Sequence, residues 1–177
     1  VRHDTEQPDN CFGALNNLSL TMMRSLREMK WMGATPAFIF PRLIHLELFY
    51  CRRLLHLSWV MYLPRLELLH IISCDGMVQA FMRCHGDKLC NGQDKTKTFP
   101  RLKLLVLIYN KSLETIGDNG MKFPSLERLE LEGSLALKRL PFWSDSLPPK
   151  LKEVRFDDAR CWERLECEEG VKTILQP

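Results

Sequence analysis

The sequence lacks any apolar run long enough to cross a membrane as a helix, which takes about twenty residues. It also lacks a strong excess of either charge, because the formal net charge is only +3 over 177 residues. So mild a charge argues against nucleic acid and against an anionic membrane surface as partners. The nearest approach to a charge block, from Glu163 to Glu169, is acidic and interrupted.

Motifs for catalysis and for nucleotide binding are missing as well. The sequence contains no G-x-x-x-x-G-K-[ST], no G-x-G-x-x-G and no G-x-S-x-G. Cys84, His85 and Cys90 offer only three metal ligands, in a spacing that common structural zinc sites do not use. We therefore expect a protein that is not an enzyme and that binds no cofactor and no metal.

An even, regularly spaced set of cysteines is also missing. The seven cysteines are an odd number, which argues against a disulfide framework and favours the reducing cytoplasm or the nucleus. The chain begins with Val1 and carries no signal-peptide pattern, so we expect a fragment of a longer protein.

What the sequence does contain is a repeated spacing of leucines. Within residues 40–57 the apolar positions follow steps of 3, 2, 3, 3 and 3: Leu43, Leu46, Leu48, Cys51, Leu54 and Leu57. The step of two places Leu46 and Leu48 on one face of a strand, and Cys51 marks the turn that follows. This is the L-x-x-L-x-L-x-x-N/C pattern of a leucine-rich repeat.

The same steps recur five more times along the chain. With Leu43 included, the first leucines are 28, 23, 36, 24 and 25 residues apart: Leu15, Leu43, Leu66, Leu102, Leu126 and Leu151. A bulky apolar residue and a proline lead into four of them: Phe40-Pro41, Leu63-Pro64, Phe99-Pro100 and Phe123-Pro124. Proline fixes φ and suits the turn before a strand. The pattern predicts an α/β leucine-rich-repeat solenoid, a horseshoe with a parallel concave β-sheet and an irregular, loop-rich convex side.

The spacing also predicts the organisation of the chain. Residues 1–10 are an irregular lead or a remnant of a preceding repeat. Residues 11–167 form about six repeats, and the interval of 36 indicates an insertion loop at 81–98. Residues 168–177 form a charged tail that closes the solenoid, which needs a polar unit at its open end.

Side chains between and beside the strand leucines point away from the core and line up in columns on the concave face. Repeats two to four place apolar residues there, flanked by tyrosines, and repeats five and six place charges. Contiguous exposed apolar surface marks an interaction site, so these residues form a candidate protein-binding face. The candidate residues are Glu47, Phe49, Tyr50, His70, Ile72, Val106, Ile108, Tyr109, Arg128, Glu130, Glu132, Arg155 and Asp157. Either a foreign partner or another domain of the same chain fits this surface.

Residues 11–167 resemble the C-terminal repeats of plant nucleotide-binding leucine-rich-repeat (NB-ARC LRR) disease-resistance proteins. The resemblance rests on the Phe-Pro-x-Leu-x-x-Leu-x-Leu lead-in, the irregular spacing and the closing Leu-Pro-Pro-Lys-Leu-Lys-Glu-Val at 147–154. It implies an intracellular immune receptor whose repeats sense a pathogen effector or a guarded host protein and restrain an upstream nucleotide-binding switch. Cysteines at the turn position also resemble the substrate-recognition repeats of F-box ubiquitin-ligase adaptors. A free-standing scaffold is the third alternative.

Overall fold

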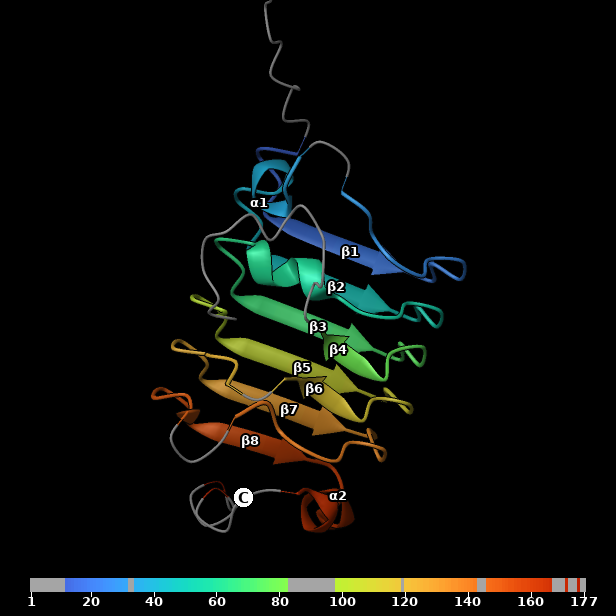
Figure 1. Ribbon diagram of the computed structural model, residues 1–177, viewed down its shortest axis with the longest axis vertical. Coiled ribbons are helices and arrows are strands. Elements are labelled where there is room, and N and C mark those ends of the chain that lie inside the picture. Colours follow the sequence, from blue (N-terminus) through green and yellow to red (C-terminus); the bar gives the residue numbers. More distant parts are fainter. Residues whose placement is uncertain are drawn as a thin grey trace, which may run out of the picture.

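The computed structural model of the chain describes residues 12–31, 34–82, 98–118, 120–142, 146–166, 171 and 175. Six strands form one parallel sheet, in the order β1 (Asn17–Thr21), β2 (His45–Phe49), β3 (Leu68–Ile72), β5 (Leu104–Ile108), β7 (Arg128–Glu132) and β8 (Glu153–Phe156). The strands stack along the long axis of the molecule (Figure 1). Each strand contains the second and third leucine positions of one repeat, so the predicted α/β solenoid is confirmed.

The return segments are more ordered than the sequence predicted. Two of them contain short strands, β4 (Gln79–Phe81) and β6 (Thr115–Gly117), which pair in parallel as a second sheet. Others contain helices: α1 (Pro36–Ile39), the 3-10 helix η1 (Ser58–Tyr62) and α2 (Ala159–Arg164). The pairing of β4 with β6 buries Ala80 and Ile116, the last apolar position of each repeat pattern.

The predicted insertion at 81–98 needs a correction at its first residue. Phe81 is buried at the end of β4 and its ring packs 4.8 Å from that of Phe99. At the other end Thr98 bridges to Lys122. Residues 83–97 lie outside the described residues, as does the predicted lead at 1–10. Of the predicted tail at 168–177 only two residues are described: Val171 is buried and Leu175 packs against the core.

The core is a stack of leucines backed by aromatic rings. The first three leucine positions of repeats two to five are at most 2% exposed. The bulky residue before each lead-in proline is buried behind them, and the rings of Phe99 and Phe123 stack with centroids 5.2 Å apart. Burying a leucine or phenylalanine contributes roughly 1.5–3 kcal/mol, so this repeated layer is a large source of stability.

A buried ladder of polar side chains links the repeats at the turn after each strand. In every rung the side chain donates to a carbonyl of the preceding strand: Cys51 Sγ to Leu20 O, Cys74 Sγ to Leu48 O, Asn110 Nδ2 to Ile71 O and Ser134 Oγ to Leu107 O. The terminal repeats depart from the pattern. Met23 is 45% exposed, and Ala159 begins α2 and is exposed instead of buried.

The residue before the turn position of each of the first five repeats lies in the left-handed region of φ. The values fall between 53° and 58° for Met22, Tyr50, Ser73, Tyr109 and Gly133. This conformation ends the strand and directs the next side chain into the core. Only glycine adopts it without steric cost, so four of these turns carry strain of about 1 kcal/mol or more.

Candidate interaction surface on the sheet

The sheet has one face packed on the core and one face, called the open face here, that corresponds to the predicted concave side. Strand pairing places the open-face residues in three columns. The first column is Asn17, His45, Leu68, Leu104, Arg128 and Glu153. The second is Ser19, Glu47, His70, Val106, Glu130 and Arg155. The third is Thr21, Phe49, Ile72, Ile108 and Glu132. The second and third columns have the predicted order.

An apolar strip occupies the third column and the turn that follows it. We define the apolar strip as Phe49, Ile72 and Ile108 with Tyr50 and Tyr109. The first three side chains are partly exposed, and the two tyrosines are 43% and 52% exposed. The tyrosines stand out because their left-handed backbone turns them away from the core. Large exposed aromatic groups of this kind are the usual anchors of protein interfaces.

Val106 was predicted to be exposed in this patch, and that prediction is wrong. Its side chain is only 5% exposed although it lies on the open face. Val106 pairs in register with His70 on one side and Glu130 on the other. Because both neighbours are longer than valine, they cover it. The second column therefore adds no apolar surface to the strip.

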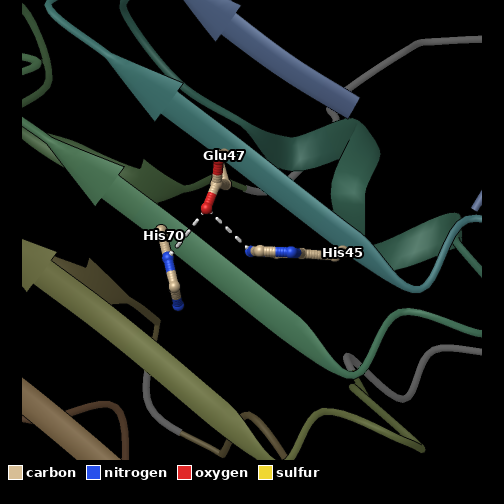
Figure 2. Close-up of side chains that lie close together, drawn as sticks. All are labelled: His45, Glu47 and His70. Atoms are coloured by element: carbon tan, nitrogen blue, oxygen red, sulfur yellow. Dashed lines mark ion pairs between the residues drawn. The ribbon is translucent and has the colours of Figure 1, made fainter. Parts of the chain in front are cut away.

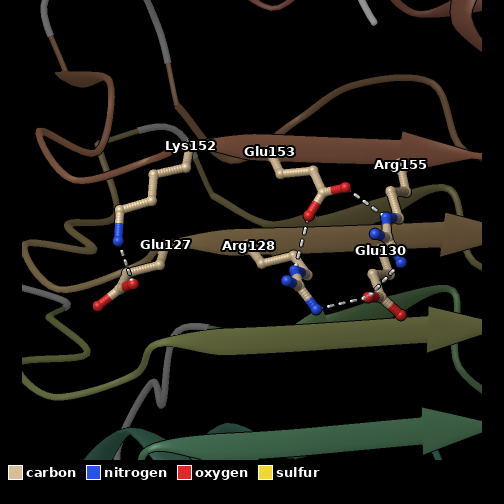
Figure 3. Close-up of polar contacts among 6 residues, drawn as sticks. All are labelled: Glu127, Arg128, Glu130, Lys152, Glu153 and Arg155. Carbon is tan, nitrogen blue, oxygen red and sulfur yellow. Dashed lines mark hydrogen bonds and ion pairs between the residues drawn. The ribbon is translucent and has the colours of Figure 1, made fainter.

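Charged side chains of β7 and β8 pair with one another (Figure 3). Arg128 Nε lies 2.8 Å from Glu153 Oε2, and guanidinium nitrogens of Arg128 and Arg155 each lie 3.7 Å from Glu130 Oε1. Hydrogen bonding to Arg155 and the charge of Arg128 lower the pKa of the Glu153 carboxyl, which keeps it ionised. We call these four residues the charged flank. Glu153 was missed by the sequence reasoning, although Arg128 of the same column was among the candidates.

The remaining charged candidates have separate positions. Glu132 is partly exposed at the end of the third column. Asp157 is exposed, and its carboxylate accepts a hydrogen bond of 3.0 Å from the backbone N–H of Gly133. Asp157 therefore fixes the turn after β7 in addition to facing solvent. Beside it, Asp158 caps the N-terminus of α2 by accepting from Arg160 N–H.

Two histidines and a glutamate meet at the N-terminal half of the open face (Figure 2). Glu47 Oε1 lies 3.1 Å from His45 Nε2 and 3.4 Å from His70 Nδ1. The two rings meet edge to face with centroids 4.9 Å apart. Burial, and then the nearby His45, lower the pKa of His70 despite the opposing effect of Glu47, so His70 is neutral at pH 7. His45 was not among the predicted site residues, although it lies in the same column as the predicted Arg128.

The sequence has a distant similarity to a known protein. No protein-family model matches the chain. Over 114 residues the chain is 28% identical to a protein of Arabidopsis thaliana named as a probable disease resistance protein. The chain has a distant relative in plant immunity. The matched stretch covers 64% of this chain and 12% of the Arabidopsis protein.

This distant homology and the solenoid fold support a role in plant immunity, as the resemblance of the repeats implied. A disease-resistance relative also fits protein partners in general. Among the residues that the structure describes, no helix has the length and apolar character that a membrane span requires.

Proposed function

We propose that this chain is a recognition domain of a plant intracellular immune receptor of the NB-ARC LRR class. In this proposal the open face binds a protein, either a pathogen effector or a guarded host protein, in the cytoplasm or the nucleus. The observation that carries the proposal is the apolar strip, whose partly exposed residues line up across β2, β3 and β5. The free thiols of Cys51, Cys74 and Cys161 agree with a reducing compartment.

The same surface supports a second step of the proposal. Without its partner the chain restrains an upstream nucleotide-binding region of the same receptor, and the partner relieves that restraint. The chain itself is not an enzyme in this scheme, and any nucleotide chemistry belongs to the other region. The distant relative named as a disease resistance protein is consistent with this arrangement.

A substitution on the strip tests the proposal in the full-length receptor. Ile108→Glu places a charge in the centre of the strip without entering the core, since Ile108 faces away from it. We expect the variant to fold and to change the cell-death response in leaves, through loss of the triggered response or through constitutive activity. Ser112→Glu adds the same charge at an exposed turn of the same repeat and should leave the response unchanged.

Two results would count against the proposal. A folded Ile108→Glu receptor with wild-type basal and triggered responses would refute a functional strip. Sequencing the transcript upstream of Val1 provides the second check, because the proposal requires a nucleotide-binding region in the same reading frame. An F-box segment there, or a start codon immediately before Val1, would instead favour a ubiquitin-ligase adaptor or a free-standing scaffold.

A further inference from the structure

Strand pairing brings three potential metal ligands together on β2 and β3. His45 and Glu47 are two residues apart on one strand and therefore share the open face. His70 pairs directly with Glu47 across the sheet. One ligand atom from each residue lies within 4.8 Å of the other two. The three side chains are therefore carried by strands in a fixed register, which position ligands more precisely than loops do.

The distances match those around a four-coordinate zinc ion. Zinc bonds to imidazole nitrogen and carboxylate oxygen are about 2.0–2.1 Å long, so tetrahedral ligand atoms stand roughly 3.3 Å from one another. The separations of 3.1 and 3.4 Å from Glu47 Oε1 to the two imidazole nitrogens are close to this value. The ligand nitrogens of the two imidazoles lie at most 4.8 Å apart, so they must approach each other by no more than about 1.5 Å when zinc binds. Each imidazole side chain is about one-quarter exposed.

The hydrogen bonding within the cluster is incomplete. Nε2 of His45 is buried and has no hydrogen-bond partner among the described residues, although Glu47 Oε1 is only 3.1 Å away. Nε2 of His45 therefore does not point at the carboxylate, and the His45 ring must turn before the two groups can share an ion. Buried polar atoms in native proteins are normally satisfied, and an unsatisfied one indicates an ion or an ordered water. A cation shared by the ring nitrogen and the carboxylate would satisfy Nε2 of His45, whereas Nε2 of His70, which is also buried without a partner among the described residues, needs an ordered water.

We propose that His45, Glu47 and His70 bind a zinc ion through Nε2, a carboxylate oxygen and Nδ1. The site leaves a fourth coordination position open toward solvent on the open face. Neutral imidazole and carboxylate are ligands that zinc accepts, and three protein ligands with one open position form a known type of zinc site. Binding at Nδ1 places the ring proton of His70 on Nε2, which lies on the side of the ring away from Glu47 (Figure 2). This inference does not depend on the proposed immune function.

The test is titration of the full 177-residue chain with zinc against a chromophoric chelator, in the presence of a non-chelating reductant. We expect one equivalent to bind. Glu47→Gln and His70→Gln each remove one zinc ligand from the open face. Loss of a residue that only hydrogen-bonds to a ligand typically weakens metal affinity roughly 10- to 100-fold, so each variant should weaken zinc binding by at least that factor. His56→Gln is the matched control, because His56 contacts Ser58 Oγ on the return side, away from the cluster. Circular dichroism checks that each variant folds.

Thiols are the competing ligands and need their own control. Substituting cobalt for zinc distinguishes the two cases, since thiolate ligation adds strong near-ultraviolet charge-transfer bands that nitrogen and oxygen ligands do not give. We expect tetrahedral cobalt bands without the thiolate bands, and unchanged affinity in Cys84→Ser/Cys90→Ser. Failure to bind one equivalent, equal affinity in the folded His70→Gln variant, or loss of binding in the cysteine variant would each overturn the proposal.

Discussion

Removing the Asn110 side chain should destabilise the solenoid more than any other single polar truncation on the ladder. Asn110 is fully buried and makes two side-chain hydrogen bonds to the preceding repeat. Its Oδ1 accepts from Cys74 N–H at 2.9 Å, and its Nδ2 donates to Ile71 O at 2.8 Å. Cys51 and Cys74 contribute only weak thiol donors, whose Sγ atoms lie 3.5 and 3.8 Å from the carbonyl oxygens that accept from them. The hydrogen bonds of Asn110 to the preceding repeat are therefore stronger than those of the cysteines.

Asn110→Ala leaves the buried Cys74 N–H without its acceptor and removes one donor from the Ile71 carbonyl. The unsatisfied N–H costs about 1–3 kcal/mol and the lost bond to the carbonyl about 0.5–1.5 kcal/mol, so we expect a loss of about 2–4 kcal/mol in the free energy of unfolding. For a domain of this size 1 kcal/mol lowers Tm by roughly 2–4 °C, so Tm should fall by about 4–16 °C. Urea unfolding followed by far-ultraviolet circular dichroism measures the free energy, and a thermal scan measures Tm.

Asn110→Cys provides the matched variant, because the chain already uses cysteine in the two preceding rungs. A thiol at this position still donates to Ile71 O, as Cys74 does to Leu48 O, but it accepts only weakly from Cys74 N–H. We expect it to lose about half as much stability as Asn110→Ala. An Asn110→Ala protein within 0.5 kcal/mol of wild type, or equal losses in the two variants, would refute the assignment of energy to these two bonds.

Two further outcomes follow from the geometry. Gly133→Ala should lower the free energy of unfolding by about 1–3 kcal/mol and displace the Tyr109 ring, because φ is 58° and an added Cβ would lie 2.2 Å from Tyr109 Cδ1. Gly120→Ala is the control, since Gly120 has a similarly positive φ but an added Cβ there would meet nothing within 4 Å. Equal losses of unfolding free energy in urea for the two variants would contradict a role for the ring. The pKa of His70 is lower in the folded chain than in the unfolded chain. As the pH falls, the unfolded chain therefore takes up a proton near pH 6.5, before the folded chain does. The free energy of unfolding is highest above that pH and declines as the pH falls below it. His45 and Glu47 on β2, Val106 on β5 and Glu130 on β7 face His70, and only the two carboxylates oppose the shift. In urea unfolding between pH 7.5 and 5.5, His70→Gln should have a flatter pH dependence than wild type, and parallel curves would show that His70 does not titrate in this way.

The register of the sheet could be predicted from sequence because a strand has a period of two. Once Leu46 and Leu48 face the core, the side chains between and beside them have only the other face available. That reasoning placed Glu47, His70 and Ile108 correctly on the open face. The buried aromatic layer follows the same repetition, because the bulky residue before each lead-in proline returns to one place in its repeat and packs behind the leucines.

The remaining features depend on neighbours that a single repeat does not specify. The burial of Val106 is set by the lengths of His70 and Glu130 on the adjacent strands. The pairing of β4 with β6 joins the return segments of repeats three and four, which the longest interval in the sequence separates. Neither return segment alone indicates that the other lies beside it. His45 and Glu153 belong to a column whose other members are mostly apolar or uncharged, so neither was distinguished before the partners from other strands were known.

The pairing of charges on β7 and β8 bears on where a partner would bind. Arg128, Glu130, Glu153 and Arg155 already satisfy one another across the two strands (Figure 3). A partner that covers these charges must remove the water around them, which costs free energy. New ion pairs with the partner return little of that cost, because an exposed ion pair contributes only about 0–1 kcal/mol. The apolar strip carries no such cost, because burying it removes hydrocarbon from water. Affinity should therefore arise over β2, β3 and β5, while the charged flank selects which partners can approach.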